Sequence, residues 1–498
     1  MRRVVRSFAV SAVLMTLLAS CGPRYDRSAL NTTASSDGLS PGAPVADGAS
    51  GPTTTQGSTT TGGTSGTTTT TGGVATSGGT TTGGATAARS GSLAGQTYRG
   101  VTATEVTIGI MASRTVNSAY EALGASDAGF PDPLDQVPPI VKWINDHGGV
   151  AGRKLKVAWH FRDDLSQDTD DAKMQQMCTD FVQDKKVFLV TSIYQAHTGA
   201  PCLADAGIPL IESGAGPARH GIPTYDDLGG YYMTPNQISM GRYARSMIEG
   251  IAKQGFFTGN VKVGLLYMGF PWAKAGVENG LKPALAKLGV KLTDEQEMRP
   301  IERASDLAGA QAEISNAVLR FKQKGINRVL GMDDQLTGFM TGAEQQDYYP
   351  RYGMGSLSLF GAPEGNPDSL KDSALVGTNV QMDVRPRWRG AQPAPEKTCR
   401  KIYIDSRQAP DDELAWGLME WHCEGLFFIK AALDRMTELS PQGLIAAAQS
   451  LTNAYVPIGV YGMHIAPRHY DGASKARLLK FYPSCGCVKY DGPAYAIP

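Results

Sequence analysis

A repeated alternation of short apolar runs and longer amphipathic stretches constrains the fold more than any other feature of the sequence. It begins at residues 106–111, whose continuous apolar and β-branched run is typical of a buried strand. Residues 134–147 carry apolar side chains at helical spacing, and Gly148 and Gly149 follow where a helix C-terminus favours glycine. The pattern continues with strands expected at 155–161, 187–191 and 208–211 and helices at 168–183 and 197–206.

The same alternation restarts near residue 237. Helices are expected at 237–253, 272–288, 306–324 and 336–347, and strands at 261–267, 290–297 and 328–332. Strands that alternate with helices favour parallel sheets covered by helices on both faces. The two runs therefore predict two doubly wound α/β domains. Ligands of such folds bind beyond the carboxyl ends of the strands, so we expect a ligand in the cleft between the two domains.

Charge and hydropathy exclude two classes of protein. The chain has 47 basic and 47 acidic residues, and this zero net charge argues against a nucleic-acid binder, which usually has a basic excess. Outside the N-terminus, no stretch approaches the roughly 18–20 consecutive apolar residues of a membrane-spanning helix. A polytopic membrane protein is therefore excluded.

The N-terminus has the pattern of an export signal. In residues 1–20, three arginines precede an apolar stretch that is too short to span a bilayer. The stretch ends in the sequence LASC at 18–21, which is similar to a bacterial lipobox. This resemblance implies that Cys21 is lipidated and anchors the exported chain to the outer face of the cytoplasmic membrane. The alternative is an ordinary signal peptide with an incidental cysteine.

A low-complexity segment separates this signal from the α/β pattern. Residues 48–88 contain no charged residue and consist mainly of Thr, Gly and Ser. Such a composition buries too little apolar surface to offset the entropy of ordering. Residues 21–95 are therefore predicted to be a disordered tether with an average reach of roughly 50 Å.

Six cysteines remain after Cys21, and an even number in an exported chain favours disulfides. Their spacing suggests the pairs Cys178–Cys202, Cys399–Cys423 and Cys485–Cys487. A Cys-x-Cys bridge is strained, so free thiols or a redox-labile bond remain alternatives for the third pair. A zinc site is the rival interpretation, but the paired C-x-x-C units or nearby histidine that it needs are missing.

Motifs for catalysis are missing from the sequence. It contains no Walker A motif, no H-E-x-x-H and no G-x-S-x-G. Gly214 and Gly216 begin a loop like that of dinucleotide-binding proteins, but Arg219 stands where Gly or Ala is needed. The carboxylate pairs Asp163-Asp164 and Asp333-Asp334 have no accompanying nucleophile or metal set. We therefore expect no catalytic residue, no metal and no cofactor, and a protein that binds rather than catalyses.

Several segments resemble the type I periplasmic binding proteins of the leucine/isoleucine/valine-binding family. The most specific is INDHGGVAGRKL at 144–155, a helix end, a glycine-rich turn and the entry to a strand. Residues 106–111, 187–206, 207–215 and 416–433 match as well, so the resemblance runs from about residue 105 to the C-terminus. It implies two Rossmann-like lobes joined by a three-crossover hinge, and lipid-anchored members deliver solutes to the permease subunits of ABC importers.

The family topology also implies domain boundaries. Lobe 1 would comprise 104–232 plus 358–452, and lobe 2 would comprise 233–357 plus 453–498. The crossovers would lie near 232–234, 355–360 and 454–461. Closure about such a hinge excludes water and brings both lobes onto one ligand.

In this family two loops of lobe 1 hold the carboxylate and ammonium of an amino acid. The resemblance assigns these roles to Ser192, Tyr194 and Gln195 after the third strand and to Ser213 and Ala215 after the fourth. Backbone N–H groups at a helix start favour a carboxylate, and hydroxyl oxygens accept hydrogen bonds from an ammonium. Tyr194 and Gln195 are bulkier than the small residues common in relatives, which argues against a standard branched-chain aliphatic ligand.

Lobe 2 is expected to complete the site. Trp272 falls where relatives often place an aromatic cover, Asp333 and Asp334 where an ammonium partner or polar anchor is expected, and Ser356 just before the second crossover. Structural alternatives exist for several of these residues: Asp334 caps the following helix, and Trp272 packs in the core. The same alternatives apply to lobe 1, where Tyr194 packs in the core and Ser213 satisfies a turn.

The expected function is that of an extracytoplasmic solute-binding lipoprotein. It captures an amino acid or a similar small polar molecule and delivers it to an ABC importer. One rival is a ligand-sensing receptor subunit of the same fold that acts with a separate signalling partner. A second rival, an exported enzyme on a doubly wound scaffold, is disfavoured because the sequence has no catalytic constellation.

Overall fold

The computed structural model describes residues 93–118, 130–214, 216, 218, 222–301, 304–333, 335–359, 366–411, 413–452 and 454–497. The signal sequence, Cys21 and all of the tether except its last three residues lie outside these residues. Two residues of the predicted ligand site, Ala215 and Asp334, also lie outside them.

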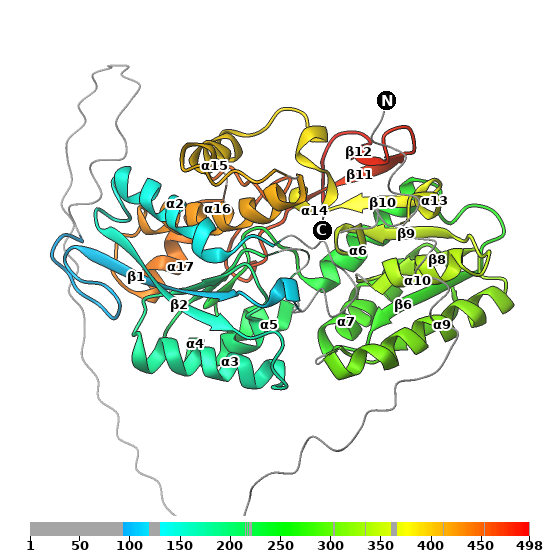
Figure 1. Ribbon diagram of the computed structural model, residues 1–498, viewed down its shortest axis with the longest axis horizontal. Coiled ribbons are helices and arrows are strands. Elements are labelled where there is room, and N and C mark those ends of the chain that lie inside the picture. Colours follow the sequence, from blue (N-terminus) through cyan, green and yellow to red (C-terminus); the bar gives the residue numbers. More distant parts are fainter. Residues whose placement is uncertain are drawn as a thin grey trace, which may run out of the picture. The chain divides into compact units, whose positions relative to one another are not determined.

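The first sheet has five parallel strands in the order β2-β1-β3-β4-β5. Its strands are β1 (Glu105–Ser113), β2 (Lys154–Arg162), β3 (Val190–Ser192), β4 (Leu210–Glu212) and β5 (Tyr232–Met233). The helices of this half are α2 (Pro133–Asp146), α3 (Asp170–Thr179), α4 (Ala200–Asp205), α5 (Ile222–Asp227), α15 (Ala394–Asp405), α16 (Glu413–Leu433) and α17 (Pro441–Ser450). Figure 1 shows α3 and α4 on one face of this sheet and α2, α16 and α17 on the other. The predicted doubly wound arrangement is confirmed for this sheet.

The second sheet has eight strands in the order β12-β11-β10-β9-β8-β6-β7, with β13 paired to β11. Its strands are β6 (Val263–Met268), β7 (Leu292–Met298), β8 (Arg328–Gly331), β9 (Arg351–Gly355), β10 (Ala374–Gly377), β11 (Lys475–Tyr482), β12 (Cys487–Tyr490) and β13 (Tyr495–Ala496). The helices of this half are α6 (Met240–Lys253), α7 (Pro271–Gly276), α8 (Lys282–Lys287), α9 (Leu307–Gln323), α10 (Gln335–Glu344), α11 (Ser356–Leu359), α13 (Pro367–Leu370) and α14 (Val380–Asp383). Figure 1 shows β6, β8, β9 and β10 running side by side.

Strand β6 shows why helices cover both faces of this sheet. Val263 and Leu265 belong to the core cluster that contains the apolar face of α6. Leu266 and Met268 belong to a second cluster with side chains of α9 and α10. Successive side chains of a strand point to opposite faces, so a continuously apolar strand needs a cover on each side.

The turn between α2 and β2 depends on backbone conformations that glycine permits. Helix α2 begins after Asp132, whose side chain accepts the N–H of Leu134 at 2.9 Å. After the helix, Gly149 has φ 68°, and a Cβ there would lie 1.9 Å from the carbonyl oxygen of Arg153. This close approach requires glycine and directs the chain back into β2.

The C-terminal part of the second sheet differs from the sequence expectation. Strands β11, β12 and β13 add to it in antiparallel fashion, whereas only parallel strands were predicted. Strand β10 pairs with β9 through Ala374–Gly353, so the second sheet extends beyond the boundary expected at residue 358. Strands β10 and β11 pair with each other although about 100 residues separate them, and a pattern read along the chain does not predict such pairing.

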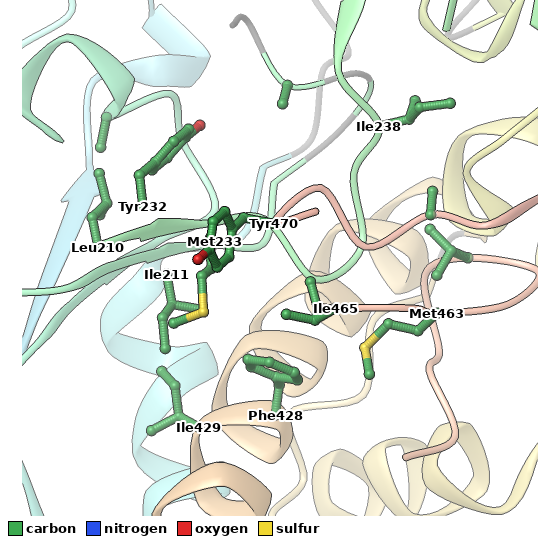
Figure 2. Close-up of a cluster of buried hydrophobic side chains, with 14 of the residues drawn as sticks. Leu210, Ile211, Tyr232, Met233, Ile238, Phe428, Ile429, Met463, Ile465 and Tyr470 are labelled. Carbon is green, nitrogen blue, oxygen red and sulfur yellow. The ribbon is translucent and has the colours of Figure 1, made fainter. Parts of the chain in front are cut away.

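A segment near the C-terminus packs into the apolar core beneath the first sheet (Figure 2). Met463, Ile465 and Tyr470 lie in one cluster with Met233 of β5 and Phe428 of α16. The backbone N–H of Thr234 donates to the carbonyl of Tyr470 at 2.9 Å. The segment that follows the crossover expected at 454–461 therefore contacts the crossover expected at 232–234.

The three cysteine pairs suggested by the spacing are the disulfides of the structure: Cys178–Cys202, Cys399–Cys423 and Cys485–Cys487. The first joins α3 to α4 and the second joins α15 to α16. Within the part of the chain that the structure describes, none of the helices combines the length and apolarity needed to cross a membrane.

Candidate functional site

The loops after β3 and β4 lie against each other at one edge of the first sheet. The parallel register aligns Ser192 with Met111 of β1 on one side and with Glu212 on the other. The N–H of Ser213 then donates to the carbonyl of Ser192 at 2.9 Å. A Cβ on Gly214 would lie 2.1 Å from the carbonyl oxygen of Ile193, so the two loops touch through their backbones. The two loops to which the family resemblance assigns ligand contacts are therefore direct neighbours.

The hydroxyl groups of the two loops are held by the protein itself. Ser192 Oγ donates to the carbonyl of Met111 at 3.0 Å and accepts the N–H of Tyr194 at 2.9 Å. Ser213 Oγ donates to the carbonyl of Trp421 at 3.3 Å. Both serines are buried, whereas Tyr194 and Gln195 are half-buried. The two serines therefore hold the loops in shape. The half-buried side chains of Tyr194 and Gln195 keep part of their surface exposed.

Helix α16 brings a neutral histidine to these loops. His422 lines a cavity of about 10 Å³ together with Ser192 and Ser213, close to the smallest space that holds one water molecule. Its side chain is almost fully buried, and burial lowers the pKa of His422 to about 3. Its Nε2 has no hydrogen-bond partner among the described residues. The group facing the serines is thus an uncharged imidazole with an unused nitrogen.

Further unused polar atoms surround Ser213. Asn236 Nδ2 donates to the carbonyl of Ser213 at 2.9 Å, while its Oδ1 makes no hydrogen bond within the described part of the chain. The same holds for Nε1 of Trp421 and for both amide atoms of Gln381. The side chains of Gln381 and Asn236 both lie close to Gly459. A Cβ there would lie 2.6 Å from Gln381 Oε1 and 2.9 Å from Asn236 Nδ2. Buried polar atoms are nearly always paired in folded proteins, so these unpaired atoms make the neighbourhood a candidate binding site.

Apolar side chains complete this neighbourhood. Ile193, Met382, Leu418 and Trp421 form a buried cluster, and Phe130, Tyr194 and Leu357 pack against it as partly buried side chains. The rings of Phe130 and Tyr194 lie 6.5 Å apart. A Cβ on Gly216 would lie 3.0 Å from Leu357 Cδ1, so the loop after β4 contacts α11 of the second half. The expectation that Tyr194 packs against other aromatics and the expectation that it faces the ligand are both compatible with this position.

The predicted residues of the second half already have structural partners. Asp333 is 2% exposed, and its carboxylate accepts the N–H of Met268 at 2.7 Å and of Gln335 at 3.1 Å. Ser356 Oγ is fully buried and accepts the N–H of Thr378 at 2.8 Å. These contacts join strand ends and the start of α10, and the expected contacts of Asp333 and Ser356 with a ligand stay predictions.

Trp272 lies at the start of α7. Its ring stacks on Phe270 with ring centroids 5.4 Å apart, and it is partly buried against the core. The stacking gives Trp272 a packing role, and its expected role as a ligand cover stays a prediction.

Sequence reasoning missed Asn236, Gln381, Trp421 and His422. A signal for one of them was present, because the apolar pattern of α16 is interrupted by Glu420, His422 and Glu424. Polar residues inside an otherwise buried helix usually have a defined partner or a function. Among the described residues, no group of three or more His, Cys, Asp or Glu side chains is arranged to hold a metal ion.

Comparisons with known proteins agree with this architecture. A family model described as "Periplasmic binding protein" matches residues 105–473. No curated protein matches the chain. Among solved structures, a branched chain amino acid ABC transporter from Thermus thermophilus with bound valine is 16% identical, with TM-score 0.55, and the match covers 79% of this chain and 97% of that one.

Two other solved structures resemble this chain to a comparable degree. A fatty acid ABC transporter substrate-binding protein from Thermomonospora curvata is 16% identical, with TM-score 0.56 and coverage of 80% and 95%. A substrate binding protein of an ABC transporter from Aeropyrum pernix is 11% identical, with TM-score 0.60 and coverage of 79% and 96%. At these identities the likeness establishes the fold.

Proposed function

Because the chain belongs to the periplasmic binding protein family, we propose that it captures a small solute between its two lobes and delivers it to an ABC importer. Binding proceeds without covalent chemistry: the solute enters an open cleft, the lobes close, and the closed form docks on the permease subunits. The solute stabilises the closed state by its higher affinity for that state.

The observation that carries this proposal is the set of unused, buried polar atoms around Ser213. They come from segments far apart in the sequence, with Asn236 after β5, Gln381 in α14 and Trp421 and His422 in α16. All are neutral groups, and the apolar cluster of Ile193, Met382, Leu418 and Trp421 lies beside them. Such surroundings suit a ligand that has an apolar body and a small polar head.

We therefore infer an amino acid or a similar small molecule as the solute. The relative from Thermus thermophilus holds valine, and the relative from Thermomonospora curvata is described as a fatty acid binder. Both named ligands join an apolar body to a carboxylate. Backbone N–H groups of the loop that begins at Ser192 are suited to such a carboxylate.

The lobe boundaries follow from the strand pairing together with the family topology. We keep the first crossover near 232–234 and the third near 454–461, where the family topology puts them. The second belongs later than residue 358, because β10 (Ala374–Gly377) is still part of the second sheet. Helix α14 directly follows β10, so we place the return to the first lobe there.

Anchoring at the membrane surface is a separate part of the proposal. It rests on the LASC sequence at 18–21, in which Cys21 is the lipidated residue. The wild-type chain is expected to partition into a detergent phase, whereas the Cys21→Ser variant should remain in the aqueous phase. A wild-type chain that stays in the aqueous phase would contradict the anchor without affecting solute binding.

A thermal-shift screen tests the main proposal. The full chain carrying Cys21→Ser is measured with amino acids, aliphatic and aromatic acids, amides, sugars and polyamines. A true ligand at 100 times its Kd raises the free energy of unfolding by about 2.7 kcal/mol. A folded chain that none of these compounds stabilises would contradict solute capture.

A matched pair of variants then tests the location of the site. Gln381→Ala is expected to weaken binding of the identified ligand by about tenfold, because it removes a buried hydrogen-bonding group. Gln311→Ala makes the same change on the exposed surface of α9 and should leave the Kd unchanged. Equal affinities of both variants would place the ligand elsewhere.

A further inference from the structure

The turn between β11 and β12 carries the disulfide Cys485–Cys487. Its cysteines are two positions apart in the sequence, whereas those of each other disulfide are 24 apart. A cross-link stabilises a fold mainly by restricting the unfolded chain, and this restriction shrinks with loop length. The short bridge therefore contributes the least of the three to stability.

The hairpin is held together without this bridge. Strands β11 and β12 pair in register from Leu479–Tyr490 to Tyr482–Cys487. Phe481 and Val488 are buried in the core cluster of the second half. Opening the disulfide thus leaves the strand pairing and the buried contacts intact.

The two sulfur atoms have different surroundings. Cys485 is partly exposed beside the exposed Gly486, so it is open to attack from solution. Cys487 is 4% exposed and lines a cavity with Arg385 and Arg387. Both cysteines of the bridge between α15 and α16 are completely buried, whereas the first bridge joins the buried Cys178 to the half-buried Cys202. What sets Cys485–Cys487 apart from the first bridge is therefore its short loop and the cationic cavity beside Cys487.

Cationic groups favour Cys487 as the leaving sulfur. Arg385 and Arg387 share the cavity lining with it, and Lys489 lies 4.4 Å from the ring centroid of Trp388, which lines the same cavity. Asp383 is the acidic residue in that lining, and its Oδ2 is engaged by Tyr461 at 2.9 Å. Positive charge stabilises a thiolate, and a thiol of lower pKa leaves faster in disulfide exchange.

We propose that Cys485–Cys487 is a thiol–disulfide exchange site that reacts with thiols in solution while the other two disulfides persist. A solution thiolate attacks Sγ of Cys485, the protein S–S bond breaks, and Cys487 leaves as a thiolate that takes up a proton. A second solution thiol attacks the mixed disulfide and releases Cys485. Two electrons pass to the protein, and the two solution thiols depart as their own disulfide.

Graded reduction of the full chain tests the site. The oxidised protein is equilibrated with mixtures of reduced and oxidised dithiothreitol, alkylated and analysed by peptide mass spectrometry. Alkylation at Cys485 and Cys487 is expected at a reduced-to-oxidised ratio at least about tenfold lower than for the cysteines of the other two disulfides, equivalent to about 30 mV. Opening of all three bridges at the same ratio would overturn the proposal.

Trapping the intermediate tests the direction of attack. Reduced glutathione should leave its mixed disulfide on Cys485, and an adduct on Cys487 instead would contradict the assignment. Arg387→Gln should slow the exchange about threefold because it removes a cation near the leaving sulfur. Arg468→Gln, at a side chain that is 83% exposed, is the matched control and should not change the rate.

A stability measurement separates exchange from a structural role. The double variant Cys485→Ser, Cys487→Ser should keep its Tm within about 2 °C of the wild type. A variant that fails to fold would show that the bridge is a structural staple and would overturn the proposal. This result is independent of whether any solute binds.

Discussion

The carboxylate of Glu424 accepts the backbone N–H of Gly459 at 2.8 Å, and this contact joins helix α16 to the segment proposed as the third crossover. The same carboxylate accepts the N–H of Ile458 and the hydroxyl of Tyr455, the latter at 2.8 Å. The carbonyl of Gly459 in turn accepts the N–H of Val380 at the start of α14. The buried Glu424 side chain therefore fixes the segment around Gly459 to α16, and the backbone of this segment in turn contacts α14.

The role of Glu424 as an acceptor can be separated from its charge. Glu424→Ala leaves the N–H groups of Ile458 and Gly459 buried and unpaired, so the free energy of unfolding should fall by at least about 2 kcal/mol. Glu424→Gln keeps an oxygen for both N–H groups, and its NH₂ can donate to Tyr455, so the change should stay within about 1 kcal/mol. Denaturant unfolding measures both. Equal losses in the two variants would show that the negative charge itself is needed.

Gly214 is expected to be indispensable for the contact between the two loops of the site. A Cβ there would lie 2.1 Å from the carbonyl oxygen of Ile193, and backbone cannot yield as a side chain does. Gly214→Ala should lower the free energy of unfolding by about 1–3 kcal/mol and weaken binding of the solute. Gly241→Ala, in α6 with no neighbour within 4 Å, is the control and should change stability by at most about 1 kcal/mol. Calorimetry of both variants, with and without ligand, tests this pair of expectations.

A buried ion-pair network fixes the segment after α14 to α16. Arg389 Nη1 lies 2.5 Å from Glu420 and 3.2 Å from Glu396, and all three side chains are at most 2% exposed. Removing the cation leaves buried carboxylates with only Arg400 nearby, so Arg389→Met should cost about 3 kcal/mol or more at pH 7. Arg468→Met breaks an exposed pair with Asp226 and should cost less than about 1 kcal/mol.

The effect of Arg389→Met should also depend on pH. Burial and the neighbouring charge of Glu420 raise the pKa of Glu396 to about 7. Near pH 5 the Glu396 carboxyl is therefore protonated in the folded chain, and the missing cation matters less. Unfolding curves at pH 5 and pH 7 should show the smaller loss at pH 5, and a loss that is the same at both would argue against this assignment.

Local sequence patterns predicted the parallel strands β1–β4 and β6–β8 because their signals are local, whereas β5 and β9 were not predicted. Residues 106–111 and 263–268 are continuously apolar, which suffices to identify a strand covered on both faces. Strand β10 has four residues, and its assignment depends on pairing with β9 and β11, of which β11 lies about 100 residues away. A pattern read along the chain does not contain such pairing.

The candidate site likewise combines features that local patterns predict with features that depend on contacts between distant segments. The loops at Ser192 and Ser213 follow strands that local patterns predict, and the structure brings them together. Asp333 was expected to face a ligand, and the structure adds a contact that local patterns do not predict, in which it accepts the N–H of Met268 on a neighbouring strand. Gln381 and Asn236 enter the site only because Gly459 lets them approach from different crossovers. Contacts that depend on three distant segments lie beyond motif analysis.

Two buried groups make opposite contributions to the pH dependence of stability. Burial raises the pKa of Asp383 to about 7, from about 3.8 in the unfolded chain. Between these values the folded chain keeps a proton that the unfolded chain has lost, so this group lowers the free energy of unfolding as pH rises. Burial lowers the pKa of His422 to about 3, from about 6.5 when unfolded. Between pH 3 and 6.5 the unfolded chain holds the extra proton, so this group raises the free energy of unfolding as pH rises.

Single variants separate the two contributions. The free energy of unfolding of the wild type minus that of Asp383→Asn should fall with pH between about 4 and 7, by at most about 1.4 kcal/mol per pH unit. The corresponding difference for His422→Gln should rise with pH between about 3 and 6.5, with the same limiting slope. Glu396, whose pKa is also raised to about 7, is present in every protein compared and cancels from both differences. Urea unfolding at half-unit pH steps measures them, and a flat difference for either variant would mean that its side chain titrates alike in the folded and unfolded chain.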